Sequence, residues 1–108
     1  MITFKQVNNY LLAEVTGEIV LANSTAIKNE LKEQIGPNDR QVILDLSKVT
    51  FIDSAGVGVL ISLLKSLNGG VLVAIVTDPV VLRVLEITRI DRLIPLVPSL
   101  AEAEAALG

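Results

Sequence analysis

The sequence lacks cysteine, histidine and tryptophan altogether, and it holds only one tyrosine and two phenylalanines. Without cysteine there is no disulfide, no thiolate nucleophile and no cysteine-ligated metal site. Without histidine there is no Ser-His-Asp triad, no histidine general base and no histidine-ligated metal. The few aromatic side chains offer no stacking platform for single-stranded nucleic acid. The missing residue types therefore disfavour most enzymes and most nucleic-acid binders.

An excess of charge is missing as well, since 9 basic residues stand against 12 acidic ones and leave a net charge of −3. Nucleic-acid-binding domains normally carry a basic surface, so we expect no nucleic-acid partner. No basic N-terminal segment precedes a long apolar stretch, and the longest apolar run falls short of the roughly 20 residues that cross a bilayer. We expect a cytoplasmic protein without a signal peptide and without direct insertion into a membrane.

Apolar residues, by contrast, are abundant and make up 51% of the 108 residues. This content is enough to bury a core, and the length suits one domain rather than two, so residues 1–108 are predicted to form a single domain. The sequence shows no base–nucleophile pair and no cofactor motif that meets its physical requirements. We therefore expect no catalytic residues, no metal and no cofactor, which favours a binding or regulatory module over an enzyme.

Hydrophobic patterning and turn residues predict an α/β fold. An antiparallel hairpin opens the chain and turns at Asn8-Asn9, because asparagine tolerates the positive φ of a two-residue turn. Capping residues mark the helix starts, and the first helix is expected to stop at Gly36-Pro37. We predict a mixed, mostly parallel sheet of four to five strands, with an antiparallel N-terminal strand and about four helices. Strands are expected at 2–7, 10–16, 42–46, 71–76 and 96–97, and helices after Asn23-Ser24, near Ser54, after Asp78 and after Ser99.

The segment Asp53-Ser54-Ala55-Gly56 opens the second predicted helix and has two interpretations. In the first, Asp53 or Ser54 only caps the helix by accepting a hydrogen bond from its free N–H groups. In the second, the segment is a regulatory site at the edge of a contact surface. The local sequence by itself favours the capping role, and the rest of the helix shifts the choice toward the regulatory site.

That helix has an outward face of small, nearly uncharged residues, whereas solvated helix faces are normally rich in Glu and Lys. Such a face indicates close contact with another surface, from this chain or from a partner. A serine at its N-terminal end can switch the contact, since a phosphate adds about −1.5 to −2 charge. The predicted core face is Val57, Leu60, Ile61, Leu64 and Leu67, and the predicted outward face is Ala55, Gly58, Val59, Ser62 and Ser66.

Glu18, Asp45 and Asp53 are a further candidate, because three carboxylates at predicted strand ends can hold a metal ion or transfer protons. Capping and turn roles account for the two aspartates. Nothing in the spacing brings Glu18 to them. We therefore expect no metal site at these residues.

Residues 42–60, VILDLSKVTFIDSAGVGVL, closely resemble the signature of the STAS domain, the fold of bacterial anti-sigma factor antagonists. The similarity extends over nearly the whole chain, which implies one STAS domain over residues 1–108. At one position the chain departs from the family: Val20 stands where an Asp usually follows the Gly-Glu-Leu motif, and in the antagonists that Asp lies near the phosphorylated serine and contributes to partner recognition. The other matching features are Gly17-Glu18-Ile19, Gly69-Gly70, Pro79, Arg83, Leu85, Ser99 and Glu102-Ala103.

The resemblance implies a partner-switching regulator. In such antagonists the serine that matches Ser54 is phosphorylated by an anti-sigma factor that is itself a serine kinase. The unphosphorylated form binds that kinase and frees the sigma factor, and a serine phosphatase acting on phospho-Ser54 resets the cycle. ATP and Mg²⁺ belong to the kinase, so no cofactor is expected on this chain. The implied partner-binding residues are Asp53, Ser54, Ala55, Gly56, Gly58, Val59 and Ser62, with Ser54 as the phosphorylation site.

Two other functions remain open. Free-standing STAS proteins also serve as structural subunits of bacterial lipid-trafficking ABC transporters, where they dock on the ATPase. A neighbouring lipid-transport operon would favour that alternative, and a neighbouring kinase-like anti-sigma gene would favour the first. An enzyme that acts through its carboxylates is the least favoured, because no base–nucleophile pair is visible.

Overall fold

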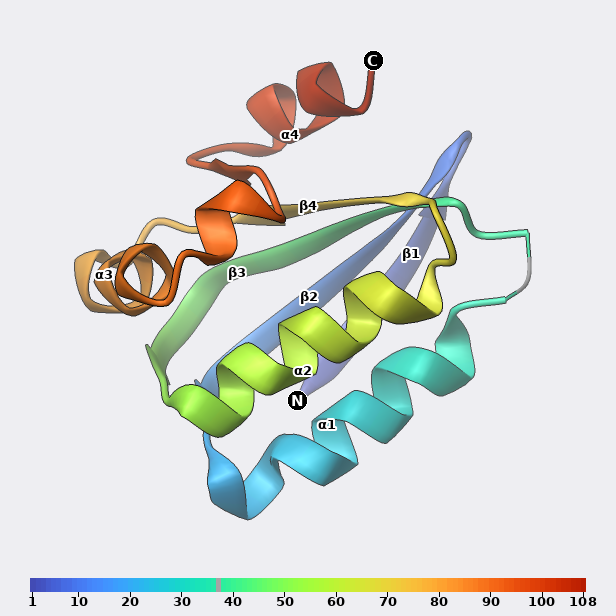
Figure 1. The fold of residues 1–108 in the computed structure, drawn as a ribbon. Coiled ribbons are helices and arrows are strands. Elements are labelled where there is room, and N and C mark those ends of the chain that lie inside the picture. The colour runs from blue at the N-terminus through green and yellow to red at the C-terminus, as the bar shows by residue number, and fades with distance from the viewer. Residues whose placement is uncertain (37) are drawn as a thin grey trace.

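The computed structural model describes residues 1–36 and 38–108, which form a five-stranded sheet and four α-helices (Figure 1). The strand order is β1-β2-β3-β4-β5, where β1 is antiparallel to β2 and all other neighbours are parallel. This confirms the predicted mixed, mostly parallel sheet. The elements are β1 Ile2–Val7, β2 Tyr10–Ile19, α1 Leu21–Gln34, β3 Gln41–Ile52, α2 Ser54–Ser66, β4 Val71–Ile75, α3 Pro79–Ile87, a 3₁₀ turn Ile90–Arg92, β5 Leu96–Val97 and α4 Leu100–Leu107.

Two strands are longer than predicted, and their extra length positions the candidate site. β2 continues past Thr16 to Ile19, and β3 continues past Leu46 to Ile52. Polar residues interrupt the apolar pattern in both extensions, which is why the sequence pattern ended the strands early. Gly17 has a φ of +94°, and the β2–β3 register shifts around it as at a β-bulge. The two strands end side by side, immediately before the starts of α1 and α2.

The first helix begins earlier than predicted. Its N-cap is Val20, whose side chain makes no capping bond, and not Asn23-Ser24. The Asn23 amide oxygen accepts the Val20 N–H at 2.9 Å, so the asparagine supports the helix start from the third helical position. Ser24 lies inside the helix and is buried. The helix stops before Gly36 as predicted, while Pro37 lies outside the described residues.

The other turn and cap predictions are confirmed, with one difference in detail. The hairpin turns at Asn8-Asn9, but neither asparagine adopts the positive φ that we expected there. The Asp78 carboxylate accepts N–H groups in the first turn of α3, and the Ser99 hydroxyl accepts the Glu102 N–H at 3.2 Å. These side chains therefore set where α3 and α4 begin.

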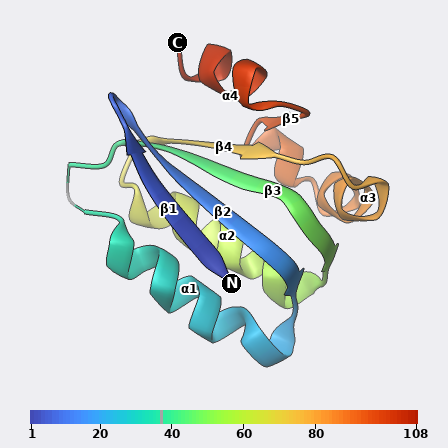
Figure 2. The ribbon, with the colours of Figure 1, turned by 180° about the vertical axis from the view of Figure 1, so that it is seen from behind.

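The helices are divided unequally between the two faces of the sheet. α1, α2 and α3 pack on one face and enclose the larger core, which includes Leu44 and Leu60. α4 packs on the other face over β3, β4 and β5, where its Ala103 joins a smaller core that includes Ile43. Seen from behind, β1 and β2 pass in front of α2 (Figure 2). In the described part of the chain, no helix is both long enough and apolar enough to span a bilayer.

Candidate functional site

Asp53 connects the starts of α1 and α2. As the N-cap of α2 it accepts the Gly56 N–H through Oδ1 at 3.0 Å, and through Oδ2 it accepts the N–H of Leu21, the first residue of α1, at 3.0 Å. The bond from Gly56, and after it the bond from Leu21, hold the pKa of the Asp53 carboxyl below its usual value, because they stabilise the charged form. Asp53, and not Ser54, is therefore the residue that caps α2.

Ser54 is the first residue of α2, and it is exposed. Since Asp53 already caps the helix, the Ser54 hydroxyl is not needed for capping. A negative charge at a helix N-terminus is favoured by about 0.3–1 kcal/mol. A phosphate on this hydroxyl would therefore be compatible with the helix that carries it.

Two exposed apolar side chains, which the sequence analysis missed, flank this turn. Leu21 is 77% exposed and Phe51 is 41% exposed. Leu21 is bonded through its backbone to Asp53, and Phe51 lies two residues before Asp53 in β3. Phe51 could have been found as an aromatic residue directly before the Ile-Asp-Ser sequence, whereas Leu21 was hidden because the helix was expected to begin later. We refer to Leu21 and Phe51 as the apolar rim.

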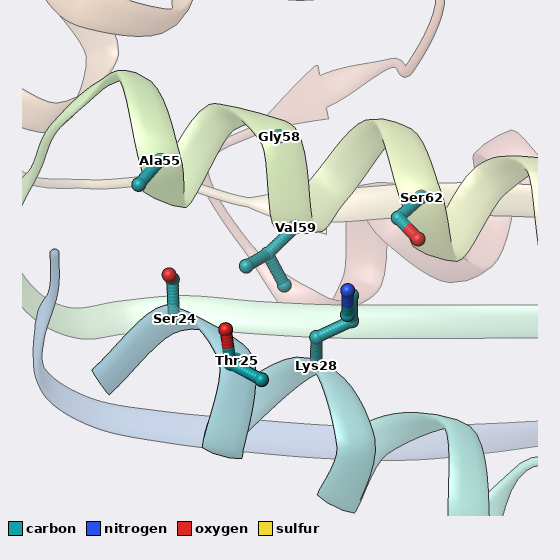
Figure 3. Close-up of a pocket in the computed structure, with 7 residues that line it drawn as sticks. All are labelled: Ser24, Thr25, Lys28, Ala55, Gly58, Val59 and Ser62. Atoms are coloured by element: carbon teal, nitrogen blue, oxygen red, sulfur yellow. The ribbon is translucent and has the colours of Figure 1, made fainter. Parts of the chain in front are cut away.

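A groove of about 260 Å³ lies between α1 and α2 (Figure 3). On the α2 side it begins with Ala55, the residue after Ser54. On the α1 side two hydroxyl groups and one ammonium group point toward α2 in Figure 3. The sequence analysis identified the α2 residues but not those of α1, because periodicity does not show which helices pack together. The lining residues are Ser24, Thr25, Lys28, Ala55, Gly58, Val59 and Ser62.

Two of the predicted partner-binding residues are buried within this chain. Val59 is only 3% exposed and points toward α1, so the prediction that it faces outward is wrong (Figure 3). Gly56 is buried too, and a Cβ there would collide with the Ile52 side chain and lie 2.5 Å from the Ile19 carbonyl oxygen. The small face of α2 therefore serves partly to admit α1 and the strand ends. Gly58 is exposed, while Ala55 and Ser62 are half-buried, so these three residues still border the groove.

Gly58 has no packing role inside the chain. It is exposed, and a Cβ there would meet nothing within 4 Å. Glycine in a helix interior costs roughly 0.5–1 kcal/mol relative to alanine. Its absent side chain leaves the side of the groove open to solvent.

The three carboxylates considered from the sequence do not form one cluster. Glu18 is paired with Phe51 in the β2–β3 register, near the end of both strands and two residues before Asp53. Asp45, however, lies further back in the sheet opposite Glu14, and its Oδ1 accepts the Ser47 N–H at 2.9 Å. Within residues 1–36 and 38–108, no group of three or more acidic side chains is placed to hold a metal ion.

Comparison with known proteins shows that residues 1–103 match the STAS domain. The chain belongs to the STAS domain family. BtrV of Bordetella bronchiseptica is 32% identical over 107 residues, which cover 97% of this chain and 92% of BtrV. A Thermotoga maritima protein is 27% identical over 106 residues, covering 95% of this chain and 94% of that protein. Both STAS relatives are named as anti-sigma factor antagonists.

Solved STAS structures have the same fold. An anti-sigma factor antagonist from Mycobacterium paratuberculosis has a TM-score of 0.91 at 22% identity, over 99% of this chain and 92% of that chain. A Thermotoga maritima structure has a TM-score of 0.88 at 27% identity, over 98% and 93%. The phosphorylated form of SpoIIAA from Bacillus has a TM-score of 0.72 at 16% identity, over 100% of both chains. These structures confirm the predicted STAS fold.

Proposed function

We propose that this STAS protein, as a single domain over residues 1–108, is an anti-sigma factor antagonist that works by partner switching in the cytoplasm. The unphosphorylated form binds a serine-kinase anti-sigma factor and so frees the sigma factor. The kinase transfers a phosphate from ATP to the Ser54 hydroxyl, which ends the binding. A serine phosphatase hydrolyses phospho-Ser54 and restores the binding form. The kinase supplies the ATP and Mg²⁺ sites, so the chain itself needs no cofactor.

The observation that carries this proposal is an exposed serine that the fold does not need, placed at the edge of a surface suited to contact. Ser54 is exposed while Asp53 does the capping. Beside it lie the exposed apolar rim and the groove left open by Gly58. A helix-interior glycine is unfavourable in an isolated domain, and contact with a partner through the groove accounts for it.

Phosphate on Ser54 would act on the interface and not on the fold. It would add about −1.5 to −2 charge directly beside the Asp53 carboxylate. The N-terminus of α2 offsets part of the repulsion, by about 0.3–1 kcal/mol. Once a partner covers the site, an unpaired charge costs several kcal/mol because it is removed from water. Docking is therefore lost while the domain stays folded.

Two substitutions at Ser54 test the charge switch. Ser54→Asp should fold normally but bind the anti-sigma factor at least about tenfold more weakly, a loss of ~1.4 kcal/mol. Ser54→Ala should bind nearly as well as the wild type and remain unmodified. Binding is measured by titration calorimetry against the serine-kinase anti-sigma factor with ADP present. Equal affinities of the two variants would contradict the charge-switch mechanism. They would favour the alternative function, a structural subunit of an ABC transporter.

Two controls locate the modification and the surface. After incubation with the kinase and ATP, peptide mapping should find the phosphate on Ser54 and not on Thr50 or Ser62. Gly58→Arg and Ser62→Arg should each abolish binding with little change in Tm, because an arginine would obstruct the groove from an accessible position. Unchanged binding by both arginine variants would contradict the proposed docking surface.

A further inference from the structure

The groove between α1 and α2 carries a positive charge that the partner-switching proposal leaves unused. The Lys28 ammonium points into the groove from α1 (Figure 3). No carboxylate lines the groove, and Lys28 takes part in no ion pair with the residues that the structure describes. The groove is therefore locally positive, although the chain as a whole has a net charge of −3.

Hydroxyl groups line the same groove from both helices. Ser24, only 8% exposed, donates its hydroxyl proton to the Leu21 carbonyl oxygen at 3.3 Å. The hydroxyls of Thr25 and Ser62 line the groove from opposite sides (Figure 3). An ammonium with nearby hydroxyl donors and no competing carboxylate is a donor set for a carboxylate group.

The size of the groove indicates a side chain as its occupant. Its volume of about 260 Å³ lies below the roughly 300–1,000 Å³ of pockets that hold cofactors or drug-sized molecules. The groove also continues directly from the proposed docking surface, since Ala55 lines it and follows Ser54 in α2. A partner that covers Ser54 is therefore positioned to insert a side chain here.

We propose that the groove receives an aspartate or glutamate side chain of the docked anti-sigma factor. Lys28 pairs with the carboxylate, and the Thr25 and Ser62 hydroxyls donate to its oxygens. Val59 provides the apolar wall against which the methylene groups of the inserted side chain pack, and Gly58 leaves the entrance free. This inference rests on the proposed function and specifies the chemistry that the partner must present.

The partner arm of the test removes the charge. Lys28→Met should weaken binding of the serine-kinase anti-sigma factor at least about fivefold, which corresponds to ~1 kcal/mol. Lys32→Met is the matched control, because Lys32 lies one turn further along α1, is exposed and does not line the groove. The control should bind like the wild type. If the wild type binds and Lys28→Met binds equally tightly, the groove proposal is overturned while the proposed function stands.

The second arm needs no partner. Acetate, added to the ¹⁵N-labelled protein against chloride at equal ionic strength, should cause saturable amide shifts around Thr25, Lys28 and Ser62. The shifts should disappear in Lys28→Met and persist in Lys32→Met. Absence of these shifts, or saturation by inorganic phosphate at concentrations where acetate has no effect, would overturn the carboxylate proposal. If no anti-sigma factor binds the wild type, the proposed function fails, and the acetate titration alone decides whether the groove takes a carboxylate.

Discussion

Gly56 and Gly58 stand two positions apart in α2, and their missing side chains serve opposite purposes. At Gly56 the space is already occupied by Ile52 and by the backbone of Ile19, so only glycine lets α2 start where the two strands end. At Gly58 the space is empty. The first glycine is required by the fold, and the second leaves room for whatever docks on the groove.

Alanine at each position separates the two roles. Gly56→Ala should destabilise the protein by about 1–3 kcal/mol, because an added methyl group overpacks a filled site. Gly58→Ala should stabilise it by roughly 0.5–1 kcal/mol, because alanine is favoured in a helix interior and meets nothing there. Urea unfolding monitored by circular dichroism gives both values. A destabilised Gly58→Ala variant would show that the groove closes over this position in solution.

At the scale of the elements, the important connection is the one between the two helix starts. A single carboxylate, that of Asp53, accepts backbone N–H groups from α1 and α2 across 32 residues of sequence. Val20 offers no side-chain cap to α1, but the Leu21 and Val20 N–H groups at this helix start are accepted by Asp53 and Asn23. The surface around Ser54 is therefore held in place by its own neighbour.

The lowered pKa of Asp53 predicts how this connection depends on pH. A group whose pKa is lower in the folded state stabilises the protein above its unfolded pKa, near 3.8, and loses that effect as the pH falls through the folded value. Wild type should therefore exceed Asp53→Asn in stability at neutral pH, and the difference should shrink below about pH 4. Urea unfolding across a pH series measures it. Asp91→Asn, at an exposed aspartate, is the control, and a pH-independent difference for Asp53→Asn would contradict the charged cap.

At the scale of the whole molecule, the two faces of the sheet have different roles: one carries the candidate site and the other holds the last helix. One face buries α1, α2 and α3 and presents the groove and Ser54. On the other face, α4 is attached by its apolar contacts and by a hydrogen bond from the Tyr10 hydroxyl to Glu104 Oε2 at 2.6 Å. That bond, together with burial and the nearby negative charge, raises the pKa of Tyr10 to about 12. It joins β2, near the start of the chain, to the last helix.

This bond can be followed directly, because Tyr10 is the single tyrosine and there is no tryptophan. An ultraviolet absorbance titration should give a phenol pKa near 12 in the wild type and a value closer to 10 in Glu104→Ala. Since the folded pKa is raised, the stabilisation is complete below pH 10 and is lost as the pH rises through about 12. Tyr10→Phe should lose about 1 kcal/mol of stability at neutral pH. Equal tyrosine titrations in wild type and Glu104→Ala would show that α4 is not held by this bond.

The sequence alone determined the features that depend on neighbouring residues. The order of strands and helices followed from periodicity, and the caps of α3 and α4 followed from Asp78 and Ser99, because a cap bonds to an N–H only two or three residues away. The start of α2 at Ser54 followed in the same way. The STAS signature then identified the fold, and the sheet order agreed with it.

Only the tertiary structure decided what depends on distant residues. Periodicity showed that one face of α2 is small, but not that α1 packs against it, buries Val59 and places Lys28 in the groove. The β2 and β3 extensions crossed polar residues because each strand gains its hydrogen bonds from the other. Gly56 became a structural residue because two strand ends meet below it. Such outcomes arise from packing between segments far apart in the chain, which local residue preferences do not encode.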